Sequence, residues 1–237
     1  MAWARSRVQA QPSRVDNGVG AGLNRLCLAV TRSLDMSGAV ITLRSTDGSE
    51  AIAAASDGTS RALAKLEFGA GEGPSRAAFE GGRPVLVSDL DDPADAPWIG
   101  YAPAATKSGV RGVFAFPLHR SGARFGVLTM LTRTRRHLDE QETSRCLALA
   151  ELATELLLAS SDATTDGEID PDLKSSLDFR SEIYQAQGMV MASLATDLPT
   201  ALARLRSHAF LEGRPLLDVA VDVIERRLTL TQEGQDP

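Results

Sequence analysis

Several groups of residues have types and spacings that could do chemistry, and a glycine-rich segment is the first. Residues 69–75, Gly-Ala-Gly-Glu-Gly-Pro-Ser, could cradle a phosphate through their backbone N–H groups. The segment lacks the Gly-Lys-Ser/Thr ending of a phosphate-binding loop, and the charge of Glu72 would repel an anion. We therefore interpret it as a turn before a short helix that opens at Pro74.

Clustered acids and three histidines are the next candidates. The acids could bind a divalent cation, but they lack the glycine and terminal glutamate of an EF-hand loop, so a solvated loop is expected. They are Asp89, Asp91, Asp92 and Asp95. The histidines, His119, His137 and His208, are far apart and have no recognisable nucleophile partner. We therefore expect neither a metal site nor a catalytic site, and the chain is not expected to be an enzyme.

Both cysteines, Cys27 and Cys146, fall within apolar helical patterns. Their spacing matches neither a disulfide framework nor a zinc site. Buried, unreactive thiols are expected, since free cysteine is among the most buried residue types. No cysteine is placed to attach a chromophore, and no cofactor is evident.

The overall charge limits the kinds of partner. The formal net charge is −6 and the isoelectric point is about 5.2, which excludes coating of nucleic acid by bulk electrostatics. Any nucleic-acid contact must therefore be local. The sequence has no apolar run of signal-peptide or membrane-spanning length, so a cytoplasmic protein without membrane contact is expected.

Charge also divides the chain into segments. The segment 162–178 has six acidic residues against Lys174 alone and few large apolar residues, as is typical of a linker. The domain before it has fifteen basic and sixteen acidic residues, a balanced globular surface. The predicted organisation is a mobile N-terminal lead over 1–16, a domain over 17–161, an acidic linker over 162–178, a helical domain over 179–231 and a tail over 232–237.

The first domain combines helical and strand patterns. Runs rich in β-branched residues predict five strands, at residues 39–44, 50–55, 84–88, 113–118 and 125–131. Apolar periodicity predicts helices at residues 19–34, 72–79 and 104–108, and a long helix after the capping box of Asp139 and Glu142. Turns at residues 46–48 and 121–122 predict two hairpins. The fold class is therefore α+β, an antiparallel sheet flanked by helices.

The second domain reads as three helices. Apolar residues from Ile183 to Leu194 mark the first, and Asp197 caps the second. Gly213 ends the second helix and Pro215 opens the third. A small all-α domain of this size is expected to gain stability from dimerisation or from its neighbour.

The first domain resembles a GAF domain in the segments FGAGEGPSRAAFEGGRPVLVSDL (68–90) and GVRGVFAFPLHRSGARFGVLTMLTR (109–133), followed by the LDEQE helix start. The resemblance implies a sensory module that dimerises through its terminal helices and has a pocket for an unidentified small molecule beside the sheet. A ligand pocket would be framed by aromatic and strand residues, and simple core packing is the alternative. The candidates are Val87, Trp98, Tyr101, Phe114 and Phe116.

The second domain resembles the ANTAR domain of bacterial transcription antitermination regulators. The match lies in IYQAQGMVMASL (183–194), the AxxxLRxxA pattern at 201–209 and GRPLLDVAVDVI (213–224). The resemblance implies binding of paired RNA hairpins by a homodimer, which prevents a terminator from forming. It places Gln187, Arg206 and Arg214 at the RNA.

Two functions therefore remain open: a signal-responsive antitermination regulator, or a protein-interaction and dimerisation module with a GAF sensor and no RNA binding. The family pattern has lysine at Gln187 and a basic residue at Ser193, and these departures favour the second. Internal ion pairs on both Arg206 and Arg214 would contradict the first. DNA binding is not expected, because the third helix carries acids where base-reading side chains are needed.

Overall fold

The computed structural model describes residues 1–11, 19–45, 50–161 and 171–230. The chain divides into two compact units: the first comprises Met1–Phe68 and Glu72–Leu173, and the second comprises Lys174–Pro237 together with Gly69–Gly71. The turn predicted at 46–48 and the tail after 231 lie outside the described residues. In the described part, no helix is both long enough and apolar enough to cross a membrane.

The first unit is built on a five-stranded sheet in the order β2-β1-β5-β4-β3, and every neighbouring pair is antiparallel. The strands are β1 (Gly38–Arg44), β2 (Glu50–Ala55), β3 (Val85–Val87), β4 (Gly112–Arg120) and β5 (Ala123–Thr132). The hairpin predicted at residues 121–122 joins β4 to β5. Ser121 and Gly122 both have positive φ there, 50° and 84°.

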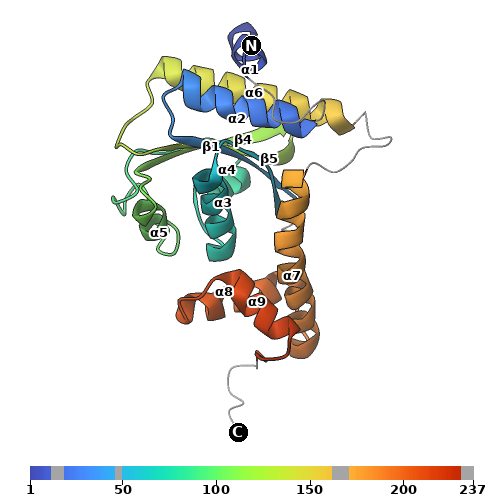
Figure 1. The fold of residues 1–237 in the computed structure, drawn as a ribbon. Helices are drawn as coiled ribbons and strands as arrows, with labels where there is room; N and C mark the ends of the chain where they lie inside the picture. The colour runs from blue at the N-terminus through green and yellow to red at the C-terminus, as the bar shows by residue number, and fades with distance from the viewer. Residues whose placement is uncertain (12–18, 46–49, 162–170, 231–237) are drawn as a thin grey trace. The chain divides into compact units, whose positions relative to one another are not determined.

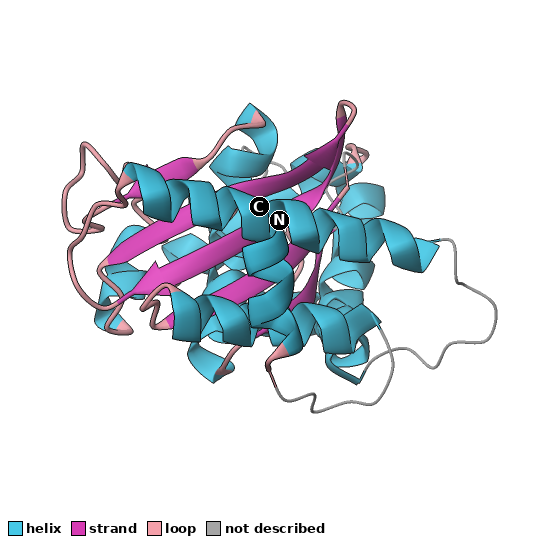
Figure 2. Cartoon of the chain, turned by 90° about the horizontal axis from the view of Figure 1, so that it is seen from above, coloured by secondary structure: helices cyan, strands magenta, loops and turns pink. Residues whose placement is uncertain are grey.

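Helices cover both faces of this sheet (Figures 1 and 2). One face carries α1 (Ala2–Gln9), α2 (Val19–Ser33) and α6 (Glu140–Ser161), which contact one another. The other carries α3 (Gly58–Ala70), α4 (Pro74–Gly81) and α5 (Ala102–Lys107). The predicted α+β class with an antiparallel sheet is confirmed.

The main core lies between the sheet and the α1, α2 and α6 layer. Its buried side chains include Leu26, Val30, Phe114, Phe116 and Leu149. Burial of apolar surface of this kind is the principal stabilising contribution, about 25 cal/mol for each Å² removed from water. The predicted capping box starts α6: Asp139 accepts from the Glu142 N–H at 2.7 Å, and Glu142 accepts from the Asp139 N–H at 3.1 Å.

Two helices of the first unit differ from the sequence analysis. Residues 2–9 were assigned to a mobile lead, and that assignment is wrong for them, because Ala4 and Val8 are buried in the main core. Helix α3 was not predicted at all. Asp57 caps this helix by accepting from the Ser60 N–H at 2.9 Å. Leu63, on the buried side of the helix, packs into an apolar cluster with residues of the sheet and of α5.

In the described part of the second unit there are three helices, α7 (Pro171–Leu194), α8 (Leu198–Leu211) and α9 (Leu216–Ile224). Asp197 caps α8 as predicted, accepting from the Thr200 N–H at 2.8 Å. Gly213 follows α8 with φ of 63°, the left-handed conformation that glycine adopts at little cost. Small and branched side chains fill the centre of the unit: Ile183, Ala186, Val190, Ala201, Leu205, Val219 and Ala220. The predicted all-α class is confirmed.

The predicted linker is too long at its C-terminal end. Helix α7 begins at Pro171, so residues 171–178 are helical, and only 162–170 lie outside the described residues. Proline is favoured in the first turn of a helix, where its missing N–H costs nothing. Acidic composition alone therefore placed the helix start about two turns too late.

Candidate functional site

The second unit presents a turn between α8 and α9 that carries Arg214. The Arg214 guanidinium is 3.2 Å from a Glu212 carboxylate oxygen and 2.5 Å from one of Asp222. Its side chain stays 38% exposed. The hydrogen bonds that Arg214 donates, first to Asp222 and then to Glu212, raise the pKa of Arg214, so the side chain remains charged. A surface ion pair is worth about 0–1 kcal/mol, which is little for a competing phosphate to overcome.

Asp222 also holds the end of the third helix. Its second carboxylate oxygen accepts from Arg227 Nε at 2.7 Å. The hydrogen bonds from Arg214 and Arg227 lower the pKa of Asp222. One carboxylate therefore ties the α8–α9 turn to the residues after α9.

Gln187 takes a structural position in the same unit. Its side chain is only 7% exposed, and its amide nitrogen donates to the Leu198 carbonyl at 2.6 Å, where α8 begins. Arg206 lies on α8, partly buried and with interactions of its own. Of the three predicted RNA contacts, Arg214 is the most exposed to a ligand. Ser193 is exposed, and its hydroxyl donates to the Val190 carbonyl.

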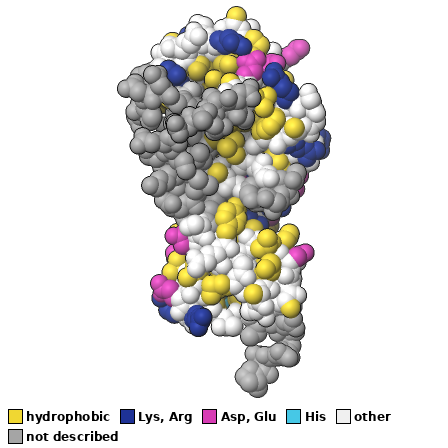
Figure 3. All heavy atoms as spheres, turned by 90° about the vertical axis from the view of Figure 1, so that its right-hand side faces the viewer, with side chains coloured by type: hydrophobic (Ala, Val, Ile, Leu, Met, Phe, Trp, Pro, Cys, Tyr) yellow, Lys and Arg dark blue, Asp and Glu magenta, His cyan; other side chains and the backbone are white. Residues whose placement is uncertain are grey.

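The surface of the second unit is mixed in charge and carries large exposed apolar side chains. Phe210 is 62% exposed and Leu211 82% exposed, both at the end of α8. On the face drawn in Figure 3, basic and acidic side chains lie interspersed, with apolar side chains between them. The coloured side chains on that face, which are those of described residues, form no continuous basic stripe of the kind that tracks a nucleic-acid backbone.

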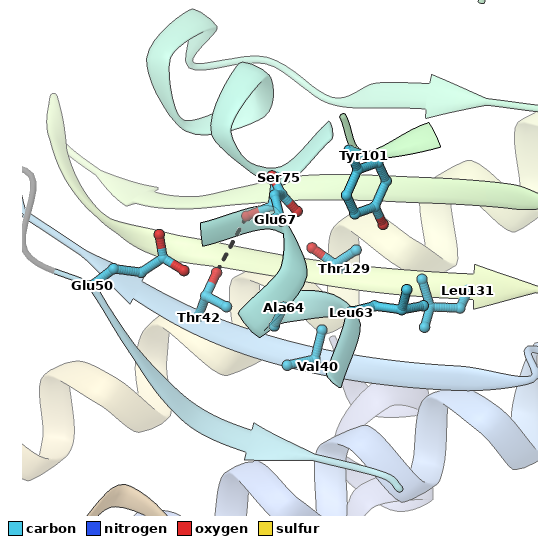
Figure 4. A pocket seen from close by; sticks show the side chains of 10 residues that line it. All are labelled: Val40, Thr42, Glu50, Leu63, Ala64, Glu67, Ser75, Tyr101, Thr129 and Leu131. Carbon is cyan, nitrogen blue, oxygen red and sulfur yellow. Dashed lines mark hydrogen bonds between the residues drawn. The ribbon is translucent and has the colours of Figure 1, made fainter. Parts of the chain in front are cut away.

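The first unit encloses a small cavity between the sheet and α3 (Figure 4). Its size corresponds to about one water molecule. The walls combine apolar and polar side chains: Val40, Thr42, Glu50, Leu63, Ala64, Glu67, Ser75, Tyr101, Thr129 and Leu131. The Thr42 and Ser75 hydroxyls are 3.3 Å apart, the dashed line in Figure 4.

Glu67 is the most unusual residue of this cavity. It is 4% exposed, and its carboxylate accepts from the Arg76 backbone N–H at 2.7 Å. Burial raises the pKa of Glu67 from its ordinary value to about 7, against the opposing effects of Arg44 and the Arg76 N–H. Gly73 makes room for it: a Cβ there would lie 2.5 Å from Glu67 Cγ.

The predicted pocket residues fall on both faces of the sheet. Tyr101 lines the cavity, and burial raises its pKa well above the ordinary value. Trp98 packs edge-on against Tyr101, with ring centroids 6.4 Å apart, and Val87 belongs to the same apolar cluster. Phe114 and Phe116 alternate with Ala115 along β4 and point into the main core on the opposite face. Their assignment to the pocket is therefore wrong, and sequence analysis missed Glu67 and Thr129.

The other candidate groups have structural roles. Arg111 pairs with Asp91 and lies 3.4 Å from Asp89, and Asp95 accepts from the Ser88 hydroxyl at 2.8 Å. Among the described residues, no three histidine, cysteine, aspartate or glutamate side chains come together as metal ligands. Cys27 and Cys146 are both buried, and burial raises the pKa of each thiol to about 12.

Comparison with protein families identifies both units. The family model described as GAF domain matches residues 21–157, and the one described as ANTAR domain matches residues 172–224. The GAF match covers most of the first unit, and the ANTAR match covers α7, α8 and α9. No curated protein matches the chain.

Solved structures with the fold of the first unit include two at 17–19% identity. The GAF domain of a phosphoenolpyruvate-protein phosphotransferase from Coxiella burnetii is 17% identical, with a TM-score of 0.52, over 68% of this chain and 92% of that one. Free methionine-R-sulfoxide reductase from Neisseria meningitidis is 19% identical, with a TM-score of 0.51, over 69% and 89%. At these identities the likeness establishes the fold alone.

Proposed function

The chain belongs to the GAF family and carries an ANTAR domain after its GAF domain, and we propose that it is a signal-responsive antitermination regulator. The GAF domain receives a signal, and the ANTAR domain binds paired RNA hairpins and so prevents a terminator from forming. Both domains are regulatory modules, and we propose no enzymatic activity. We place the protein in the cytoplasm, as a homodimer without DNA or membrane contact.

The observation that carries this proposal is the three-helix ANTAR unit with a charged, accessible arginine in the turn before its third helix. Arg214 keeps 38% of its side chain exposed although it pairs with two acids. The planar guanidinium suits bidentate contact with phosphate, and hairpin loops offer unpaired bases beside it. We propose Arg206 on the preceding helix as a second contact, while Gln187 supports the start of α8.

The charge balance favours two copies acting together. Residues 179–237 have six arginines against eight acids, so one monomer has few cations with which to neutralise phosphates. A homodimer that places one ANTAR domain on each of two linked hairpins gains affinity through effective concentration. This supports recognition of paired hairpins over a single one.

Filter binding with a two-hairpin RNA at low and moderate salt tests the proposal. Arg206→Ala and Arg214→Ala should each weaken retention about ten-fold or more, since hydrogen bonds to charged groups contribute about 1.5–3 kcal/mol. Each should also reduce the slope of affinity against salt by about one unit. Arg120→Ala, an exposed arginine at the end of β4, is the matched control and should bind as the wild type does. Equal retention by all four proteins would refute these contacts.

A protein-interaction module is the second candidate, and two observations favour it. Phe210 and Leu211 are exposed together at the end of α8, a feature more typical of protein interfaces than of soluble surfaces. The ion pairs of Arg214 reduce its availability to RNA. This function predicts no RNA retention by the wild type at any salt concentration.

A further inference from the structure

The cavity of the GAF domain has a charge imbalance that a ligand could correct. Two buried carboxylates, Glu50 and Glu67, share the guanidinium of Arg44, whose side chain is 10% exposed. Arg44 Nη2 is 2.7 Å from Glu50 and 3.9 Å from Glu67, so the guanidinium is committed to Glu50. Glu67 accepts from the Arg76 backbone N–H, and the cation paired with it is the same Arg44, at the longer distance of 3.9 Å. A buried carboxylate in this position is costly while it is charged.

A second, independent feature lies across the cavity from Glu67. The Thr129 side chain is 3% exposed, and its hydroxyl oxygen has no hydrogen-bond partner among the residues that the structure describes. Buried hydroxyls are normally satisfied, and each exception calls for an explanation. Figure 4 shows the Glu67 carboxylate, the Thr129 hydroxyl and the Tyr101 ring around one space. The Thr129 hydroxyl oxygen, which lacks a hydrogen-bond partner, therefore lines the same cavity as the Glu67 carboxylate.

The remaining walls complete the recognition chemistry. Tyr101 is 1% exposed and contributes an aromatic ring to the wall of the cavity. Val40, Leu63 and Leu131 give an apolar floor that suits a methyl group better than a hydrated metal ion. The cavity is about the size of a water molecule, and an ammonium group is of similar size.

We infer that the Glu67–Thr129 cavity is a binding site for a small primary amine, whose ammonium group donates to Glu67 and Thr129 beside the Tyr101 ring. In this conformation the cavity has room for about the ammonium group alone. An alkyl group on the nitrogen, even the single methyl group of methylammonium, requires the covering residues, α3 and the Gly73 turn, to move. The inference rests on the sensory role proposed for the GAF domain and gives its signal a chemical class.

Titration of the full-length protein with methylammonium chloride tests the site. Amide and methyl NMR shifts near Glu67 and Thr129 should change and saturate in the millimolar range. Sodium chloride and tetramethylammonium chloride at equal ionic strength should produce no such change, because neither offers an N–H donor that fits the cavity. A non-saturating response, or an equal response to all three salts, would overturn the inference.

Three variants locate the binding. Glu67→Gln removes the charge, Thr129→Val removes the hydroxyl at nearly constant shape, and Glu151→Gln removes an exposed carboxylate on α6. We expect at least ten-fold weaker binding in Glu67→Gln, several-fold weaker binding in Thr129→Val and wild-type binding in Glu151→Gln. Wild-type affinity in the first two variants would contradict the assignment. RNA retention by filter binding is measured separately, so a failure of the amine site is distinguishable from a failure of the RNA-binding proposal.

Discussion

The Glu67 carboxyl should give the GAF domain a stability that depends on pH between 4.5 and 7. Burial raises its pKa from 4.5 to about 7, so the folded protein holds this proton more tightly than the unfolded chain. The stabilisation is therefore fully present below pH 4.5 and is lost as the pH rises to 7. A shift of this size corresponds to about 3 kcal/mol of unfolding free energy, at 1.36 kcal/mol per pKa unit.

Glu67→Gln should remove this dependence, because glutamine keeps the shape and a carbonyl acceptor for the Arg76 N–H but has no charge. We expect the free energy of unfolding of the variant, relative to that of the wild type, to increase by about 3 kcal/mol between pH 4.5 and pH 8. Other titrating groups are common to both proteins and largely cancel in the difference. The Arg44–Glu50 ion pair, at 2.7 Å, should remain in both.

Urea unfolding at several pH values, followed by tryptophan fluorescence, measures this difference. Trp3 and Trp98 are the only tryptophans of the chain and both belong to the first unit, so the signal reports that unit. Phosphate and acetate buffers are preferred, since Tris is itself a primary amine. If the difference in unfolding free energy between variant and wild type stays constant within about 0.5 kcal/mol from pH 4.5 to 8, the reasoning is refuted. That result is expected when Glu67 is wholly solvated, because its pKa is then the same in the folded and unfolded states.

Three further predictions follow from single contacts. Asp197→Ala should cost the second unit about 1 kcal/mol, measured by circular dichroism, because it removes the α8 cap; a loss below 0.3 kcal/mol would speak against that cap. Cys27 and Cys146 should resist iodoacetamide in the native protein at pH 8 and both react in denaturant, as mass spectrometry would detect; rapid native labelling would contradict their burial. Gly126→Ala should destabilise the first unit by about 1–3 kcal/mol or more in the same urea experiment, because the new Cβ would lie 2.0 Å from the Thr42 carbonyl oxygen. Gly58→Ala is the control and should be close to neutral, because the space around Gly58 is open.

Most of the fold could be predicted from the sequence, because the local sequence signals agree with the tertiary contacts. All five strands lie within a few residues of their predicted positions, and the capping box before α6 forms as expected. Helix α3 was missed because its buried face mixes Leu63 and Phe68 with Glu67, so apolar periodicity alone is weak there. The signal that could have found it is Asp57, three residues before Ser60, which caps the helix.

The candidate sites were harder to predict, because they depend on which face of the sheet a residue occupies. Strand alternation separates Phe114 and Phe116 from the cavity, but the sequence does not say which face of β4 meets which helix layer. Tyr101, an aromatic residue in a loop beside the sheet, lies at the cavity, and its role toward a ligand stays a prediction. Glu67 on α3 and Thr129 on β5 are 62 residues apart in the sequence, and only the packing of α3 against the sheet brings them to one cavity.

The short strand β3 also limits how two GAF domains can associate. It forms one margin of the sheet with only three residues, Val85–Val87, and Pro84 before it has no N–H to offer. Few backbone groups are therefore left for a neighbouring sheet to continue the ladder there. Self-association at that margin is disfavoured, and because a continuous ladder of sheets needs both margins, the short β3 protects the domain from polymerising edge to edge even though β2 forms the other margin.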